Sequence, residues 1–139
     1  MKKILFALAF IGMFASCGKD TTTTTTPPSS TALLQNKWNL ISIQDIEYVG
    51  ASTSIVDTVI SYGIAGDYIQ FNANNTAYYR IAGSEDTVAY NLINSSKLAF
   101  DGDTFTVNTL SANDLVMTYY GRETTPTVHN WDNVLVLKK

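Results

Sequence analysis

The chain has 139 residues, of which 45 % are hydrophobic and 15 % charged, so it is long enough for one domain and too short for a two-domain enzyme. Its formal net charge of -3 offers no basic surface for the phosphates of nucleic acid, which excludes that class of partner. The single cysteine, Cys17, rules out a disulfide within the chain.

Residues 1–16 have the features of a leader that directs export. Lys2 and Lys3 form a cationic start, and the uncharged apolar run Ile4–Phe14 follows. A helix of that length rises about 16 Å, roughly half the thickness of a bilayer's hydrocarbon core. The run therefore predicts the hydrophobic part of a signal peptide and not a membrane span.

The leader ends at Phe14-Ala15-Ser16-Cys17, where two small residues precede the cysteine. This order resembles the lipobox of bacterial lipoproteins, which implies cleavage before Cys17 and lipidation of Cys17 with acyl chains such as palmitate. Two or three acyl chains would anchor the protein permanently in a lipid bilayer. The alternatives are an ordinary signal peptide with Cys17 nearby by chance, and a buried free thiol at Cys17.

The residues after the cysteine bear on location and on where the folded domain starts. Gly18 follows the cysteine, where an aspartate would resemble the inner-membrane retention signal of enteric bacteria. We therefore expect the protein to be anchored in the cell outer membrane. Whether it lies on the periplasmic or the surface face is left open. Lys19 and Asp20 look like part of a surface-export signal. The run Thr21–Thr26 and the prolines after it have no apolar area to bury. We therefore expect residues 17–32 to form a disordered tether and residues 33–139 to form the domain.

The domain shows the period-two pattern of half-buried antiparallel strands. Thr104 and Thr106 alternate with Phe105 and Val107, and similar phases recur along the chain. The pairs and triplets expected on one face are Ile69 with Phe71, Val88 with Tyr90 and Leu92, Leu98 with Phe100, and Leu115 with Met117 and Tyr119.

Turn chemistry divides this pattern into nine strands. Asp101-Gly102 predicts a two-residue hairpin turn, and weaker signals stand at Asn72–Asn75, Gly83-Ser84, Asn94–Ser96 and Ser111–Asp114. One helical turn is expected at Thr31–Gln35. The expected strands are Trp38–Glu47, Ser54–Tyr62, Asp67–Phe71, Thr76–Ile81, Thr87–Ile93, Lys97–Phe100, Asp103–Thr109, Leu115–Tyr120 and Asn133–Lys138.

Hairpins that follow one another without a crossover helix predict an all-β fold, an antiparallel up-and-down meander. Eight or nine strands suffice to close such a meander into a small barrel. The alternative is an open β-sandwich made of the same strands.

Several segments resemble lipocalin-like domains of small bacterial lipoproteins. They are Leu34–Ser42, Tyr68–Phe71 with Asn74 and Asn75, Phe105–Met117, and Leu135–Lys138. The resemblance implies a β-barrel in which Trp38 plugs one end; simple packing of Trp38 in the core is the alternative. Asn36 stands where many members carry glycine before the tryptophan strand.

The sequence contains little that supports catalysis. The one histidine, His129, lies in a stretch that has the composition of a loop, and Cys17 is assigned to lipid. Asp101-Gly102-Asp103 fits a hairpin turn better than a calcium loop, because Phe105 occupies the next ligand position. We expect no enzyme activity, no catalytic residue, no metal and no cofactor.

The eight tyrosines each offer an apolar ring with a polar tip, which suits a ligand cavity or an adhesive outer face; ordinary cross-strand pairing is the alternative. The leading hypothesis is a lipid-anchored envelope protein whose barrel binds a small apolar or amphipathic ligand. The candidate ligand-binding residues are Phe71, Tyr90, Phe105, Met117 and Tyr119.

The alternative is a solid barrel that acts as a protein-interaction or inhibitor module toward an envelope protein. In that case exposed faces around Tyr79 and Tyr120 would make the contact, and apolar side chains would fill the interior. Strand parity groups Arg80 with Thr76 and Tyr78 and so places it on the outer face.

Overall fold

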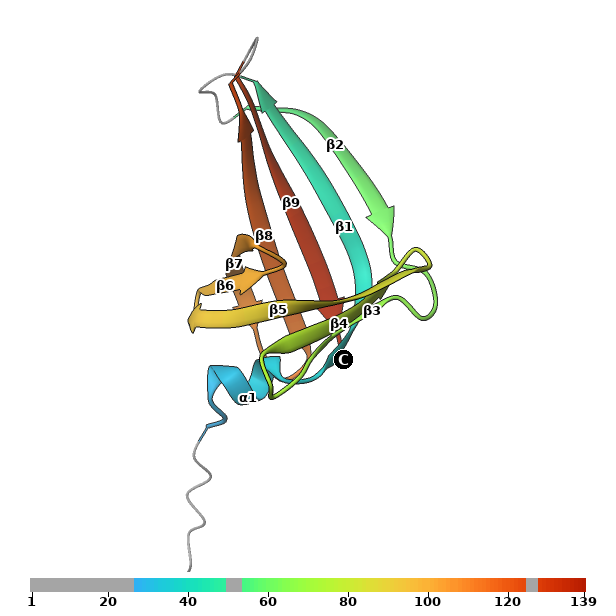
Figure 1. Cartoon of the computed structure of the whole chain (residues 1–139). Helices are drawn as coiled ribbons and strands as arrows, with labels where there is room; N and C mark the ends of the chain where they lie inside the picture. Colours follow the sequence, from blue (N-terminus) through green and yellow to red (C-terminus); the bar gives the residue numbers. More distant parts are fainter. Residues whose placement is uncertain (1–26, 50–53, 125–127) are drawn as a thin grey trace, which may run out of the picture.

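The computed structural model describes residues 27–49, 54–124 and 128–139. One short helix precedes nine strands (Figure 1): α1 (Ser30–Leu34), β1 (Lys37–Val49), β2 (Ile55–Tyr62), β3 (Tyr68–Phe71), β4 (Thr76–Ile81), β5 (Ser84–Asn94), β6 (Lys97–Phe100), β7 (Asp103–Leu110), β8 (Asp114–Glu123) and β9 (His129–Lys138). The expected leader, Cys17 and the tether as far as residue 26 lie outside the described residues. The last residues of the expected tether belong to α1, since that helix begins at Ser30.

Eight of the strands close into an antiparallel barrel. The hydrogen-bonded order runs β1-β3-β4-β5-β6-β7-β8-β9, and β9 pairs again with β1. The all-β, antiparallel barrel predicted from the sequence is confirmed, and the open sandwich is wrong. Such a barrel is consistent with the lipocalin-like fold.

The remaining strand, β2, lies outside the barrel. It pairs only with β1, through Ser42–Tyr48, whereas β3 pairs with the start of β1 at Lys37–Asn39. Figure 1 shows β1, β2, β8 and β9 continuing together beyond the other strands. We call this four-stranded sheet the extension; it comprises residues 44–49, 55–60, 120–123 and 129–134.

The barrel is closed at the end where α1 lies. Trp38 is fully buried, and its indole Nε1 donates a hydrogen bond to the carbonyl oxygen of Leu34 in α1 at 2.9 Å. Asn36 donates through Nδ2 to the carbonyls of Ala32 and Leu33, at 3.2 and 2.9 Å, which satisfies the end of the helix. The side chain of Asn36 thus takes the role of partner for two carbonyl groups at the end of α1 by donating hydrogen bonds to both.

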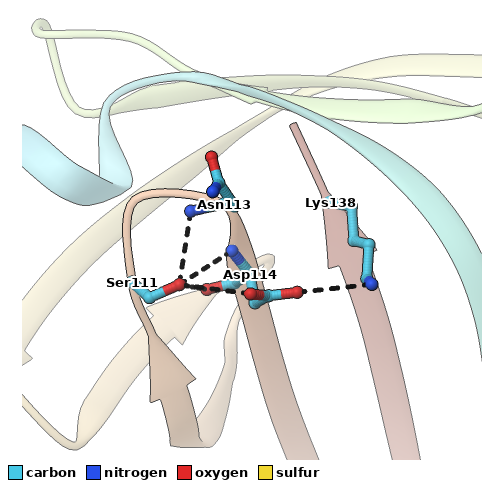
Figure 2. Close-up of polar contacts among 4 residues, drawn as sticks. All are labelled: Ser111, Asn113, Asp114 and Lys138. Carbon is cyan, nitrogen blue, oxygen red and sulfur yellow. Dashed lines mark hydrogen bonds and ion pairs between the residues drawn. The ribbon is translucent and has the colours of Figure 1, made fainter.

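The turn between β7 and β8 also lies at this closed end. The Ser111 hydroxyl accepts hydrogen bonds from the backbone N–H groups of Asn113 and Asp114, at 3.2 and 2.9 Å (Figure 2). Lys138 of β9 lies 3.6 Å from the Asp114 carboxylate, and the neighbouring Lys139 nitrogen lies 4.8 Å from the Trp38 ring. The turn expected at Ser111–Asp114 is confirmed, and its Asp114 forms an exposed ion pair with β9.

Two tight turns mark the other end of the barrel, which we call the mouth. Asp101 and Gly102 have φ values of 53° and 84°, as a type I′ hairpin requires, which confirms the turn predicted there. Ala82 and Gly83 have φ values of 51° and 82° and join β4 to β5. The expected turn at Gly83-Ser84 is therefore wrong by one residue, and Ala82 adopts the left-handed conformation despite its Cβ.

Candidate ligand-binding site at the barrel mouth

An apolar pocket of about 330 Å³ lies at the mouth. Its walls come from β3, β4, β5, β6 and β9, together with the β6–β7 turn. The lining residues are Ile69, Tyr79, Ile81, Ser84, Phe100, Asp101 and Leu135. Ser84 and Asp101 stand at the two mouth turns, so the polar groups lie at the rim of an apolar cavity.

Strand alternation directs these side chains inward. On β4, Ala77 is buried and Tyr79 and Ile81 are half-buried, whereas Arg80 between them is exposed. Inward-facing positions therefore run along β4 from the core to the mouth. At the mouth fewer side chains surround them, so Tyr79 and Ile81 are only half-buried. Arg80 pairs with Glu85 at 3.6 Å on the outer surface, which confirms its predicted outward position.

The structure places the five candidate ligand residues in the packed core or against it, and not in the pocket lining. Phe71, Tyr90, Phe105 and Met117 are buried, and Tyr119 is half-buried against the core. None of them is among the residues that line the pocket.

An aromatic chain joins four of these residues through Phe100. Phe100 is 5.8 Å from Phe71 and 5.9 Å from Phe105, measured between ring centroids. Tyr90 contacts Phe71 at 5.0 Å, and Tyr119 contacts Phe105 at 5.6 Å. Because Phe100 also lines the pocket, this chain forms the packed floor beneath it.

Tyr90 has a bonding role at the closed end. Its hydroxyl donates to the backbone carbonyl of Asn72 at 2.7 Å and accepts a hydrogen bond from Gln35 at 3.4 Å. These contacts tie the β3–β4 turn to the residue that follows α1.

The strand phase predicted for β5 is confirmed, since Val88 and Leu92 flank the buried Tyr90 on the inner face.

None of the seven residues that line the pocket was among the predicted ligand residues. Tyr79 was expected on an exposed interaction surface, but it lies inside the barrel, 6.4 Å from Phe100 between ring centroids. The parity that placed Arg80 outside required Tyr79 and Ile81 to point inside, so the signal was present. Tyr120 is 57 % exposed, as expected.

A buried carboxylate holds the mouth together. Asp67 is 4 % exposed, and its two oxygens accept hydrogen bonds from the backbone N–H groups of Ile64 at 3.0 Å and Ala82 at 3.1 Å. One side chain thus joins the β2–β3 connection to the β4–β5 turn. In the same connection, a Cβ on Gly63 would overlap the backbone of Leu40, so only glycine lets the two segments meet.

The inner face of the extension continues upward from the pocket wall. Leu135 of the pocket pairs with Ile43, and the next inward pair along the same strands is Asn133 with Asp45. The Asn133 amide donates a hydrogen bond to the Asp45 carboxylate. A polar pair therefore lies directly beyond the apolar wall.

Trp131, two residues before Asn133 on β9, is the next residue that lies on this face. It lies over Gly121 of β8, where a Cβ would overlap the indole ring. Trp131 is half-buried, in contrast with the fully buried Trp38.

Leu135 and Leu137 alternate with the half-buried Val134 and Val136, and β9 is the strand that closes the barrel.

Two tyrosines on outer surfaces have perturbed acidities. Burial raises the pKa of Tyr48, and its 3.0 Å hydrogen bond to the Asp132 carboxylate raises it further. A 2.6 Å hydrogen bond to the Glu85 carboxylate raises the pKa of Tyr78 to about 12. Both hydroxyls therefore stay protonated at neutral pH.

The groups that could support catalysis are sparse in the described parts of the chain. His129 is exposed and begins β9, so its expected place in a loop is wrong. Residues 27–49, 54–124 and 128–139 contain no cluster of three or more potential metal ligands. Among the same residues, no helix is long and apolar enough to cross a bilayer.

Comparison with known proteins adds no family assignment. No family model matches the sequence, and neither the curated proteins nor the solved structures yield a significant match.

Proposed function

We propose that the barrel binds a small apolar or amphipathic molecule at its mouth, without catalysis. The observation that carries this proposal is the apolar pocket of about 330 Å³ above a packed aromatic floor. Ligand sites in proteins begin at about 300 Å³ and combine apolar walls with a few polar groups, as this one does.

The dimensions favour a small ligand or one end of a longer one. At roughly 30 Å³ per water-sized volume, the cavity holds on the order of ten non-hydrogen atoms. The hydroxyl of Ser84 and the carboxylate of Asp101 stand at the rim and can meet a polar group. An aromatic ring or a short acyl chain inside, with its polar end facing the mouth, satisfies both parts of the site.

We also propose that the chain acts at the cell envelope, as a lipoprotein anchored through Cys17. The support is the order of apolar run, small residues and cysteine at positions 4–17. The anchor would hold a ligand-binding barrel beside a bilayer, which is a source of apolar ligands. We favour the outer membrane, and the partners of this chain would be the bilayer, the ligand and an envelope protein.

The anchor has its own test. In the native host, replacing Cys17 with serine should move the protein from the membrane fraction to the soluble fraction and abolish labelling by a palmitate analogue. Replacing Ser95, an exposed residue on the β5–β6 turn, with alanine should change neither. Membrane retention of the Cys17→Ser protein would refute the lipid anchor.

The second candidate function is a protein-interaction module. The closed half of the barrel is filled by Trp38, Phe71, Leu98, Leu115 and Met117, all with relative exposure of 2 % or less, as a solid barrel requires. The free strand β2 supplies a surface for a partner. If the mouth binds no small ligand, this protein-interaction function becomes the favoured proposal.

The test of the ligand site uses the full chain in mild detergent below its critical micelle concentration and N-phenyl-1-naphthylamine, whose fluorescence rises in apolar surroundings. We expect saturable binding and at least about tenfold weaker binding for Ile81→Trp, because the larger ring fills the pocket. The control, Ile93→Trp, makes the same change at an exposed residue outside the pocket and should bind as the wild type does. No saturable binding, or equal loss in both variants, would contradict the proposal.

A further inference from the structure

The strand β2 is an open edge with apolar side chains. It pairs with β1 on one side and lies at the end of the hydrogen-bonded order, and Figure 1 shows it as the outermost strand of the extension. An edge strand presents unpaired N–H and C=O groups that can pair with another strand. Within the described parts of the chain, this row of backbone groups has no strand partner.

The side chains of β2 give the edge little protection, since Asp57 is the strand's one charged residue. All eight residues are exposed, and the strand contains no lysine or proline, the residues that usually block edge pairing. The large apolar side chains on the strand are 45 % to 75 % exposed: Ile55, Val56, Val59, Ile60 and Tyr62. They lie on both faces of the strand, so an added strand would cover apolar area above and below the sheet.

A pair of carboxylates identifies the charge that this edge would accept. Asp57 of β2 lies directly opposite Glu47 of β1, so both side chains are on one face of the extension. Like charges in this position repel each other. Asp57 accepts the backbone N–H of Thr58 at 2.8 Å, and the ion pairs formed in the described residues involve other groups. A cation beside Asp57 would relieve this repulsion.

From these observations we infer that β2 is a docking edge for an extended peptide segment of a partner protein, with a lysine or arginine opposite Asp57 and apolar residues beside it. The peptide would add a tenth strand to the sheet. Its backbone would pair with β2, and its basic side chain would lie near both Asp57 and Glu47. This mode of recognition combines main-chain hydrogen bonds with side-chain selection.

The same charge pattern argues against a second copy as the occupant. Residues 55–62 read Ile-Val-Asp-Thr-Val-Ile-Ser-Tyr and contain no basic residue. Antiparallel pairing of two β2 strands would therefore leave both carboxylate pairs without a cation. A heterologous strand removes the repulsion, whereas a copy does not.

The test measures fluorescence anisotropy of a labelled, end-blocked peptide of alternating valine and threonine with one central lysine. Full-length protein in mild detergent should bind it saturably. Exchanging the central lysine for glutamate should weaken binding about tenfold, as should Asp57→Lys in the protein. Asp57→Lys should in turn prefer the glutamate peptide, a reversal that unfolding cannot produce.

The chain contains a matched control for this substitution. Asp86-Thr87-Val88 on β5 repeats the local sequence of Asp57-Thr58-Val59, and Asp86 accepts the N–H of Thr87 at 2.6 Å. However, Asp86 lies opposite Tyr79 of β4 instead of a second carboxylate, and the residues before it, Ser84 and Glu85, are polar, so this site lacks the carboxylate pair and the apolar neighbours of Asp57. Asp86→Lys should therefore leave peptide binding unchanged.

Three results would overturn the proposal. The first is absence of saturable binding, and the second is equal binding of the lysine and glutamate peptides by the wild-type protein. The third is a concentration-dependent dimer in sedimentation experiments that the lysine peptide does not dissociate, since that would assign the edge to a second copy. A peptide N-methylated at alternate residues should bind at least about tenfold more weakly, because it cannot complete the backbone pairing.

Discussion

The two ends of this barrel differ in how their side chains are used. At the closed end, α1 covers a core in which Leu34, Trp38 and Leu115 are fully buried. At the mouth, Tyr79 and Ile81 are half-buried around a pocket, and the extension beyond it exposes β2. The difference teaches that the closed end supplies stability, which leaves the mouth and the extension available for binding.

Substitution of the two tryptophans tests most directly whether stability is concentrated at the closed end. Trp38→Ala should lower the free energy of unfolding by about 3–5 kcal/mol, because it leaves a cavity and removes the bond to α1. Trp131→Ala, on the half-buried extension, should cost about 1 kcal/mol. Urea unfolding followed by circular dichroism measures both. Equal losses would show that stability is not concentrated at the closed end.

At the mouth, substitution of Asp67 should lower the free energy of unfolding by nearly as much as a substitution in the core. Asp67→Ala removes both backbone bonds of a buried carboxylate and should cost about 2 kcal/mol. It should also free the β4–β5 turn from the β2–β3 connection, so the amide of Ala82 should exchange with deuterium faster. The exposed Asp86 provides the comparison, and Asp86→Ala should change stability by less than about 0.5 kcal/mol. If the Ala82 amide kept its protection in Asp67→Ala, the clamp would be disproved.

A smaller effect is expected where β8 and β9 meet in the extension. Gly121→Ala places a Cβ where the Trp131 indole lies, so the ring must move, at a cost of about 1 kcal/mol. The two indole N–H resonances in an NMR spectrum separate the regions. That of Trp131 should shift, and that of Trp38 should stay, because Trp38 lies at the closed end. An unmoved Trp131 resonance would contradict the contact.

The smallest effect concerns acidity on the outer surface. The Glu85 hydrogen bond raises the pKa of Tyr78 above the ordinary value of 10.0 to about 12. Any stability it contributes is therefore present below pH 10 and is lost as the pH rises through 12. In Glu85→Gln, the pKa of Tyr78 should fall toward 10, as measured by NMR of labelled tyrosine. Titration of Tyr78 near 10 in the wild-type protein would show that the bond does not persist in solution.

The sequence predicted the strands because their signals are local. Alternation places Phe105 and Val107 opposite Thr104 and Thr106, and the structure buries Phe105 and Val107. The Asp101-Gly102 turn depends only on the positive φ that these two residues tolerate. Pairing of strands far apart in sequence then closes the barrel.

The position of β2 could not be read in the same way, because it depends on how a distant strand is shared. β1 has 13 residues, and it uses its first residues for β3 and its later ones for β2. One signal was present: Ile55-Val56 and Val59-Ile60 place apolar side chains on both faces, which a barrel strand with one wet face does not need. Similarly, β9 begins at His129 because the extension provides β8 as a partner there.

The candidate ligand residues show the corresponding limit for the site. Strand phase correctly placed Phe71, Phe105 and Met117 inside. It could not tell which inward residues have neighbours on every side and which border a cavity, because that depends on the side chains that surround each residue in the closed barrel. Leu135 borders the pocket although it pairs directly with Met117, which is fully buried.

The most direct test of the central claim is an NMR titration of the methyl-labelled full-length protein with N-phenyl-1-naphthylamine. The account predicts that the methyl signals of Ile69, Ile81 and Leu135 shift saturably, whereas those of Leu34 and Leu115 stay in place. Shifts confined to β2, or no shifts at the mouth, would contradict a ligand site in the barrel.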